Sequence, residues 1–509
     1  MKKLLKFLGR VLLHGIVVGI IWLDLYFMNI NEWLAIFLTI AWIVSVRVAE
    51  GLLAKKAGEK ASDGEPKKGS GKLGSRIFFG VLDVAVLLFV VASTLCNPYW
   101  NSDNMRQNAS HEESGSKVFS KSDALADYDF MMKYVKKVHP LALGGLPDDV
   151  EKRAEEVRAW IEAQDQIEGY VLARELESIL SLLGDGHTMV EETYDEYHVM
   201  KHVYEHNKAG HTLVGINGVR FEEFLAQHPA IESYETESYG IRLIKNRITN
   251  LEGLKYLGID ISGEITYNYV TEEGEEVLEI VKAEDFLLME EYLMYEEEVT
   301  GDDLHGDEDR GFVYYDIDAE HDLAILTLNS CRYNQVYKDT VKAMFDEIHE
   351  KGISNICVDL RRNGGGSSMV ANEFIEYLDV DTYKSWGEEL RLGWFLKKAD
   401  GGIVKNHKKS KVFTGNVYIL TGVRSYSAAM DFAMLIKDNG IGKILGQPCG
   451  NIPASYGQVV HFYLPKTGMY MQVSMKKWYR VDMTKNGELL YPDIECPEDK
   501  AMEVLLDNL

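Results

Sequence analysis

The sequence predicts an α/β protein with a preceding helical unit, a small β-rich module and three transmembrane helices at the amino terminus. Two observations support this fold class. From residue 311 onward, short apolar runs typical of buried strands alternate with segments of helical periodicity. This alternation is the pattern of a largely parallel sheet covered by helices on both faces. The first 96 residues contain three long apolar runs instead.

The amino-terminal region, residues 1–96, is interpreted as a membrane anchor. Its apolar runs, Val11–Met28, Trp33–Val48 and Ile77–Cys96, approach the roughly 20 residues that a helix needs to cross a hydrocarbon core. Basic residues precede the first run and follow the second. The positive-inside rule therefore predicts a multi-pass protein of the cell membrane, with a cytoplasmic amino terminus and an extracellular domain after Cys96. A cleaved signal peptide is the alternative for the first run, although no small-residue cleavage site follows it.

Charge and cysteine content limit the possible partners. The chain has 54 Lys and Arg residues against 80 Asp and Glu residues, a net charge of −26. Such an acidic chain binds nucleic acid poorly, so no nucleic-acid partner is expected. The five cysteines show no CxxC spacing, which argues against a disulfide scaffold and against a zinc site built on them.

Three segments are expected between the anchor and the α/β core. Residues 97–122 are polar without an apolar period, as in a solvated linker. Residues 123–199 carry apolar side chains at helical spacing and predict a helical unit. Residues 200–310 are harder to interpret. Two apolar runs, Ile265–Val270 and Glu276–Val281, flank Glu273-Gly274 as in a hairpin, so a small β-rich module is expected there.

The α/β core is expected over residues 311–509, with its ligand site at the carboxyl ends of the parallel strands. Two sequence features lie at such ends. The first is the glycine-rich stretch Asp359–Gly366, which directly follows the apolar strand residues Ile356–Val358. Glycines let backbone amides approach a ligand closely, so the amide of Gly364 or Gly365 is a candidate oxyanion donor. The stretch lacks the Lys-Ser/Thr of a phosphate-binding P-loop.

The second feature is Ser427, which follows the predicted strand Val417–Leu420 and begins a predicted helix. A serine at this position is commonly a helix N-cap. As a nucleophile, it would stand at the positive end of the helix dipole, with the amide of Ala428 free to complete an oxyanion hole.

A third motif, Leu183–Thr188, places His187 in a turn of small residues. A histidine there is commonly structural. With a pKa near 6.5, however, an accessible imidazole can accept a serine proton and return it to a leaving group. Ser427, His187 and the glycine-rich turn thus supply the nucleophile, base and oxyanion donors of acyl transfer.

Together these motifs, with the closing Tyr491–Ile494, resemble the ordered signatures of the C-terminal-processing and tricorn-type serine peptidases, the tail-specific protease superfamily or peptidase family S41. The resemblance implies a core related to the crotonase-like and ClpP-like sheets. Members with a Ser/Lys dyad carry the lysine in a late glycine-rich segment, but the matching stretch Gly446–Ile452 has none. The chain therefore resembles the tricorn-type branch, in which a histidine is the base and a late glutamate orients it; Glu488 is the candidate.

The function expected from the sequence is a membrane-anchored, extracytoplasmic serine peptidase that acts on a peptide or protein substrate and needs no metal or cofactor. The alternative is a catalytically inactive peptide-binding protein on the same fold.

Overall fold

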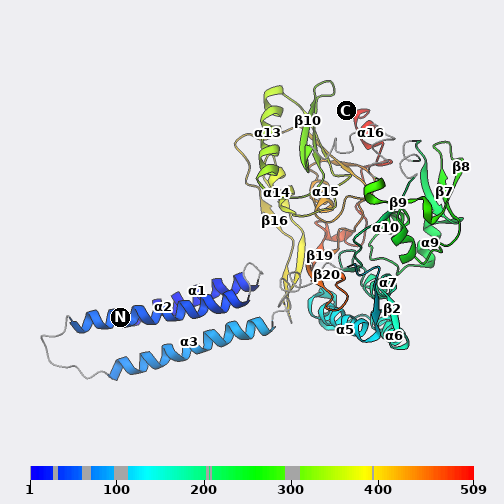
Figure 1. Ribbon diagram of the computed structural model, residues 1–509. Coiled ribbons are helices and arrows are strands. Elements are labelled where there is room, and N and C mark those ends of the chain that lie inside the picture. The colour runs from blue at the N-terminus through cyan, green and yellow to red at the C-terminus, as the bar shows by residue number, and fades with distance from the viewer. Residues whose placement is uncertain are drawn as a thin grey trace. The chain divides into compact units, whose positions relative to one another are not determined.

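A computed structural model describes residues 2–26, 32–59, 70–96, 113–201, 206, 209–292, 310–392 and 395–509. The chain divides into two compact units, residues 1–108 and residues 109–509. Figure 1 shows the helices of the first unit in blue and the mixed α/β second unit in cyan to red.

The first unit consists of three helices, α1 (Lys2–Tyr26), α2 (Glu32–Glu59) and α3 (Ser70–Cys96). Polar side chains pair between them. Trp42 donates a hydrogen bond of 2.8 Å to His14, and Asp83 pairs with His14 and with Arg47.

The prediction of three transmembrane helices is wrong. In the part of the chain that the structure describes, none of the helices has an apolar stretch of the length needed to span a bilayer. Charged side chains such as Arg47 and Asp83 stand within the apolar runs. The predicted multi-pass placement in the cell membrane, with the carboxyl-terminal domain outside the cell, depended on these three helices. It is therefore wrong as well.

The second unit begins with the helical region that the sequence predicts. Its helices are α5 (Lys121–Val138), α6 (Asp148–Ala163) and α7 (Gly169–Leu180). Ser120 caps α5 by accepting a hydrogen bond from the amide of Asp123. Ser120 also ends strand β1 (Val118–Ser120), which pairs with β2 (Gln166–Glu168). The linker was expected to end at residue 122, but residues 118–122 belong to β1 and α5. Residues 97–112 lie outside the described part.

A β-rich module follows. Its four-stranded sheet has the order β6-β5-β7-β8, with the following strands: β5 (Thr212–Ile216), β6 (Val219–Arg220), β7 (Ile265–Val270) and β8 (Glu276–Val281). The predicted hairpin is the antiparallel pair β7 and β8. Helices α9 (Phe221–Gln227), α10 (Glu237–Ile248) and α11 (Leu251–Tyr256) lie between β6 and β7 in sequence. Residues 293–309 lie outside the described part.

The α/β core is a six-stranded sheet, in which β10 is antiparallel to β11 and the other neighbouring pairs are parallel. Its strands, in spatial order, are β10 (Val313–Asp318), β11 (Leu323–Leu328), β12 (Asn355–Asp359), β17 (Asn416–Thr421), β18 (Lys443–Gly446) and β21 (Ile494–Glu495). This mixed α/β architecture agrees with the class predicted from the alternation.

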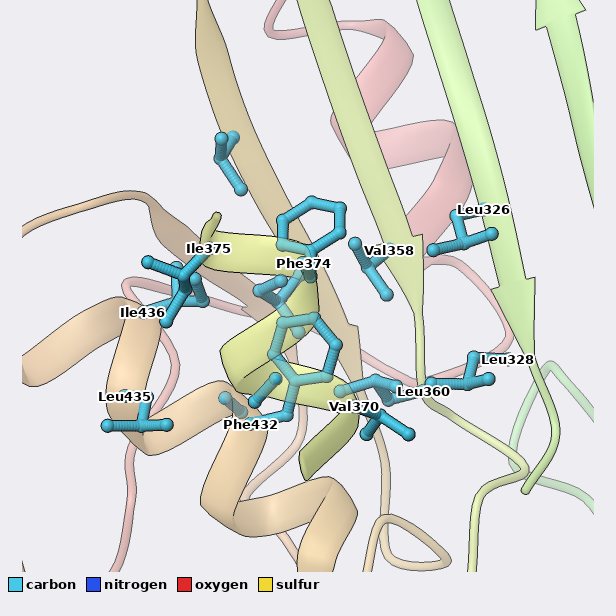
Figure 2. Close-up of a cluster of buried hydrophobic side chains, with 14 of the residues drawn as sticks. Leu326, Leu328, Val358, Leu360, Val370, Phe374, Ile375, Phe432, Leu435 and Ile436 are labelled. Atoms are coloured by element: carbon cyan, nitrogen blue, oxygen red, sulfur yellow. The ribbon is translucent and has the colours of Figure 1, made fainter. Parts of the chain in front are cut away.

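Helices cover both faces of this sheet. A hydrophobic core lies on each face. The larger core packs against α13 (Gln335–Lys351), α14 (Met369–Ile375) and α15 (Ala428–Asp438), and the smaller core packs against α16 (Ala501–Leu506). Figure 2 shows the side chains of α14 and α15 meeting those of β11 and β12 in the larger core. The packing holds α14 and α15, and the turns that precede them, at the carboxyl ends of β12 and β17.

A second, five-stranded sheet stands beside the core and was not predicted. It contains β3 (Met189–Glu191), β14 (Gly387–Leu392), β15 (Phe395–Ala399), β19 (Tyr456–Tyr463) and β20 (Tyr470–Tyr479). β3 begins two residues after His187 and pairs antiparallel with β20. The loop that carries His187 is thus attached to this second sheet.

We expect Phe374→Ala to lower the free energy of unfolding by about 3–5 kcal/mol, because it opens a cavity in the packed core. Phe374 is fully buried on α14, and its ring centroid lies 5.6 Å from that of Phe345 and 5.3 Å from that of Phe432. Met369→Ala on the same helix is the control, since Met369 is 49% exposed. Equilibrium urea unfolding measures both; equal losses would contradict this packing.

Candidate active site

Ser427 stands in a sharp turn between β17 and α15. It is the last residue before the helix, and its backbone angles are φ 54° and ψ −123°. A residue with a side chain is rarely found there, at a cost of about 1–3 kcal/mol, and such strain concentrates at functional sites. The Ser427 side chain makes no capping hydrogen bond to α15. The geometry is therefore that of a serine presented at a strand-to-helix turn rather than that of a simple N-cap.

Neighbouring loops hold this strained turn in place. The Ser427 amide donates a 2.8 Å hydrogen bond to Oδ1 of the buried Asn451. The Tyr426 amide donates to the carbonyl of Asn363 at 3.0 Å. The Ser425 hydroxyl is buried, donates to the Leu360 carbonyl at 2.8 Å and accepts the Gly422 amide at 3.0 Å. The conformation of Ser427 is thus fixed from both sides.

The glycine-rich loop lies against the Ser427 turn. Gly365 has φ +105°, and a Cβ atom there would come within 2.8 Å of both Ser427 Cβ and the Tyr426 carbonyl oxygen. Glycine is therefore required by space and by backbone conformation. The Gly365 amide is already engaged, because it donates to Asn363 Oδ1 at 2.8 Å. Among the described residues, no partner is found for the amides of Gly364 and Ala428, so these two are the available donors.

The His187 loop is organised by a buried carboxylate. Asp185 is fully buried. Its Oδ1 accepts the His187 amide at 2.8 Å, and its Oδ2 accepts the Thr188 hydroxyl at 2.6 Å and lies 3.1 Å from His139 Nε2. Thr188 in turn accepts the amide of Ser474, on β20, at 2.9 Å. The loop is therefore fixed to the helical unit and to the second sheet.

Two carboxylates face the His187 ring. Its Nδ1 lies 3.7 Å from Asp185 Oδ1 and 3.7 Å from Glu235 Oε1. The Glu235 side chain is 1% exposed, and its Oε2 accepts the Ile452 amide at 3.1 Å. The other side of the imidazole packs on Tyr426, with ring centroids 4.9 Å apart. Since Tyr426 precedes Ser427, the structure brings the predicted histidine to the predicted serine turn.

These surroundings change the acidity of all three groups. Burial disfavours the imidazolium form of His187, but the adjacent carboxylates of Asp185 and Glu235 outweigh it and raise the pKa to about 9. Burial also raises the pKa of Glu235, against the opposing effect of His187. Burial acts in the same direction on Asp185, yet its hydrogen bonds to His139 and His187 hold its pKa well below the usual range.

Glu235 was missed by the sequence reasoning. It lies in the segment 200–310 that the sequence left without a firm interpretation. Its local sequence gives no sign of catalysis; the following Thr236 is simply the N-cap of α10. Only the tertiary fold brings Glu235 to His187.

The predicted glutamate, Glu488, occupies a different environment. It is exposed, and its amide donates to the carbonyl of Lys485 in a turn after β20. No described contact joins its side chain to His187.

His187 and Ser427 are not hydrogen-bonded in this structure. The Nε2 atom of His187 is buried and has no hydrogen-bond partner among the described residues. Catalytic hydrogen bonds are commonly long in unliganded enzymes and shorten when substrate binds. The site thus contains the side chains predicted as nucleophile and base, without a direct hydrogen bond between them.

Known proteins resemble this chain in fold. Residues 322–496 match the model of Peptidase family S41, whereas no curated protein sequence matches the chain. Mature CPAF complexed with lactacystin has 12% sequence identity and a TM-score of 0.53, over 76% of this chain and 97% of that one. A second structure of mature CPAF has 12% identity and a TM-score of 0.51, over 76% and 96% of the two chains. The photosystem II D1 C-terminal processing protease has 12% identity and a TM-score of 0.40, over 76% and 97%.

Proposed function

We propose that the chain is a serine-type peptidase in which Ser427 is the nucleophile and His187 the base, because residues 322–496 match the model of Peptidase family S41. The observation that carries this proposal is the strained backbone of Ser427 with Gly365 pressed against it. A serine with a merely structural role has no need of a conformation that costs about 1–3 kcal/mol.

In the proposed mechanism, Ser427 Oγ attacks the carbonyl carbon of the scissile peptide bond while Nε2 of His187 accepts the hydroxyl proton. The negative charge moves to the carbonyl oxygen, where the amides of Gly364 and Ala428 stabilise it. The intermediate collapses to an ester on Ser427 and expels the amine, which takes the proton from His187. Water, deprotonated by His187, then hydrolyses the ester and restores Ser427.

We propose Glu235, rather than Glu488, as the positioning residue of His187. The Oε1 atom of Glu235 faces Nδ1 at 3.7 Å, and the side chain is buried. A carboxylate there fixes the tautomer with its proton on Nδ1 and leaves Nε2 free to act as a base. Asp185, held on its other oxygen by Thr188 and His139, supports the same orientation.

Glu235→Gln is expected to lower kcat by about 10²- to 10⁴-fold at alkaline pH, since an amide does not stabilise the imidazolium that forms during the reaction. Glu488→Gln, the matched control, should leave kcat unchanged. If Glu235 had only a structural role, Glu235→Gln would lower kcat without moving the pH profile. If its carboxylate raises the pKa of His187, the midpoint of the pH profile should shift to lower pH. The reverse pattern, with only Glu488→Gln impaired, would restore Glu488 as the positioning residue.

We expect kcat/KM of the wild type to rise with pH, about tenfold per unit below a midpoint near pH 9, and to level off above that midpoint. The base must be neutral to accept a proton, and the pKa of His187 is raised to about 9 by Asp185 and Glu235. Hydrolysis of an unstructured polypeptide, followed from about pH 6 to about pH 10, measures the profile. A plateau already reached near pH 7 would show that His187 is not the titrating base.

The direct test of the proposed function is labelling of the full chain with a fluorophosphonate probe, which reacts with activated serines. The wild type should be labelled at Ser427, and Ser427→Ala and His187→Ala should not. The second candidate, an inactive peptide-binding protein, is favoured by one observation: Nε2 of His187 has no hydrogen bond to Ser427 among the described residues. A folded wild type that resists the probe would support that candidate.

A further inference from the structure

Three donor atoms from different segments of the chain converge on one point beside the proposed base. They belong to Asp185, His187 and Glu235, and one donor atom of each residue lies within 4.8 Å of the other two. The Nδ1 atom of His187 is buried and has no hydrogen-bond partner among the described residues. An unpartnered buried nitrogen that faces two carboxylates indicates that something belongs between them.

The spacing of these atoms suits metal ligands better than hydrogen-bond partners. Nδ1 is 3.7 Å from each carboxylate oxygen, which exceeds the usual hydrogen-bond distance of about 2.7–3.2 Å. Zinc binds histidine nitrogen and carboxylate oxygen at about 2.0–2.2 Å, so the donors at neighbouring corners of its tetrahedron lie about 3.4 Å apart. The two distances from Nδ1 exceed this spacing by about 0.3 Å. A zinc ion held by these three residues would keep its fourth position for water.

The surroundings already orient these ligands as those of a metal site. The second oxygen of Asp185 accepts the Thr188 hydroxyl and faces His139, and that of Glu235 accepts the Ile452 amide. Outer hydrogen bonds of this kind fix ligating carboxylates. Asp185 and Glu235 are buried, with side-chain exposures of 0% and 1%. A divalent cation would compensate both negative charges where water is excluded.

We propose that Asp185, His187 and Glu235 bind a divalent transition-metal ion, with Zn²⁺ as the fitting case, and that the bound ion inhibits the enzyme; this second part rests on the proposed peptidase function. The inhibition follows from the tautomers of imidazole. A neutral imidazole carries one proton, so coordination through Nδ1 places that proton on Nε2. Nε2 then has no lone pair with which to accept the proton of Ser427.

Binding is tested without reference to activity. Zn²⁺ is titrated into the full-length metal-free chain in competition with a fluorescent zinc chelator. Relative to wild type, Glu235→Gln and His187→Ala should each lose one tight equivalent, and Asp185→Asn should weaken it at least about tenfold. Ser427→Ala and Glu488→Gln should retain it. Because Glu235→Gln preserves side-chain size, it guards against a loss caused by misfolding. An unchanged stoichiometry and affinity in folded Glu235→Gln would overturn the site.

Inhibition is tested by the rate of fluorophosphonate labelling at Ser427 with and without one equivalent of Zn²⁺. Zinc should slow labelling of the wild type at least about tenfold, and EDTA should restore it. Tight zinc binding with unaffected or faster labelling would overturn the inhibitory role while leaving the site. A wild type that is unlabelled even in EDTA would overturn the proposed function, and with it the inhibition, whereas the chelator titration decides the metal site independently.

Discussion

Replacing Ser427 with alanine is expected to lower kcat by about 10⁴- to 10⁶-fold, the scale of losses seen when a nucleophilic serine is removed from a peptidase. The change removes only the hydroxyl, which makes no capping bond to α15. We therefore expect the free energy of unfolding to stay within about 0.5 kcal/mol of wild type. Peptide hydrolysis and urea unfolding on the same preparations measure the two quantities.

Ser425→Ala is the matched control, two residues earlier in the same turn. Its hydroxyl is buried between the Leu360 carbonyl and the Gly422 amide, so its removal leaves both groups without that partner. We expect a loss of about 1–3 kcal/mol in unfolding free energy and a much smaller loss of kcat than for Ser427→Ala. If Ser427→Ala retained more than about a tenth of the wild-type kcat, another group would have to be the nucleophile.

His187→Ala is expected to have an effect of the same order, because a nucleophile and its base act as a unit. The double variant with Ser427→Ala should therefore be no less active than either single variant. His321→Ala is the control histidine, since His321 is exposed and pairs with Asp318 on the surface. Single-turnover hydrolysis near pH 9, where the His187 pKa of about 9 leaves much of the base neutral, measures all four proteins.

The outcome also separates the two catalytic schemes of the peptidases that the sequence resembles. Strictly additive losses, or a His187→Ala variant with near-normal activity, would exclude His187 as the base. A lysine would then have to serve instead, which the sequence of Gly446–Ile452 does not supply.

The candidate site residues that lie in local motifs could be selected from the sequence. Ser427, His187 and the glycine-rich loop each belong to a short stretch with its own turn chemistry, and the alternation of strands and helices placed two of them at strand ends. The sequence left Gly364 and Gly365 as equal candidates. The fold distinguishes them, because only in the folded chain does Asn363 occupy the amide of Gly365.

What the sequence did not reveal depends on contacts between distant segments. Glu235 reaches His187 from a module whose pattern is weak, and Asn451 supports Ser427 from a separate loop. Neither role has a local signature. The second sheet was missed because its strands come from separate regions of the chain, including β3 beside the His187 motif. The transmembrane prediction failed for a different reason. It relied on the length of the three apolar runs and gave too little weight to the charged residues within them.

The attachment of His187 has a consequence for how activity would arise during folding. His187 is held through β3 and Thr188 to the second sheet, whereas Ser427 follows a strand of the core sheet. These sheets join segments far apart in the chain, and such long-range contacts form late. A core sheet that has folded alone therefore presents the serine without its proposed base. If Ser427 and His187 act as proposed, hydrolytic activity is therefore expected only after both sheets have formed.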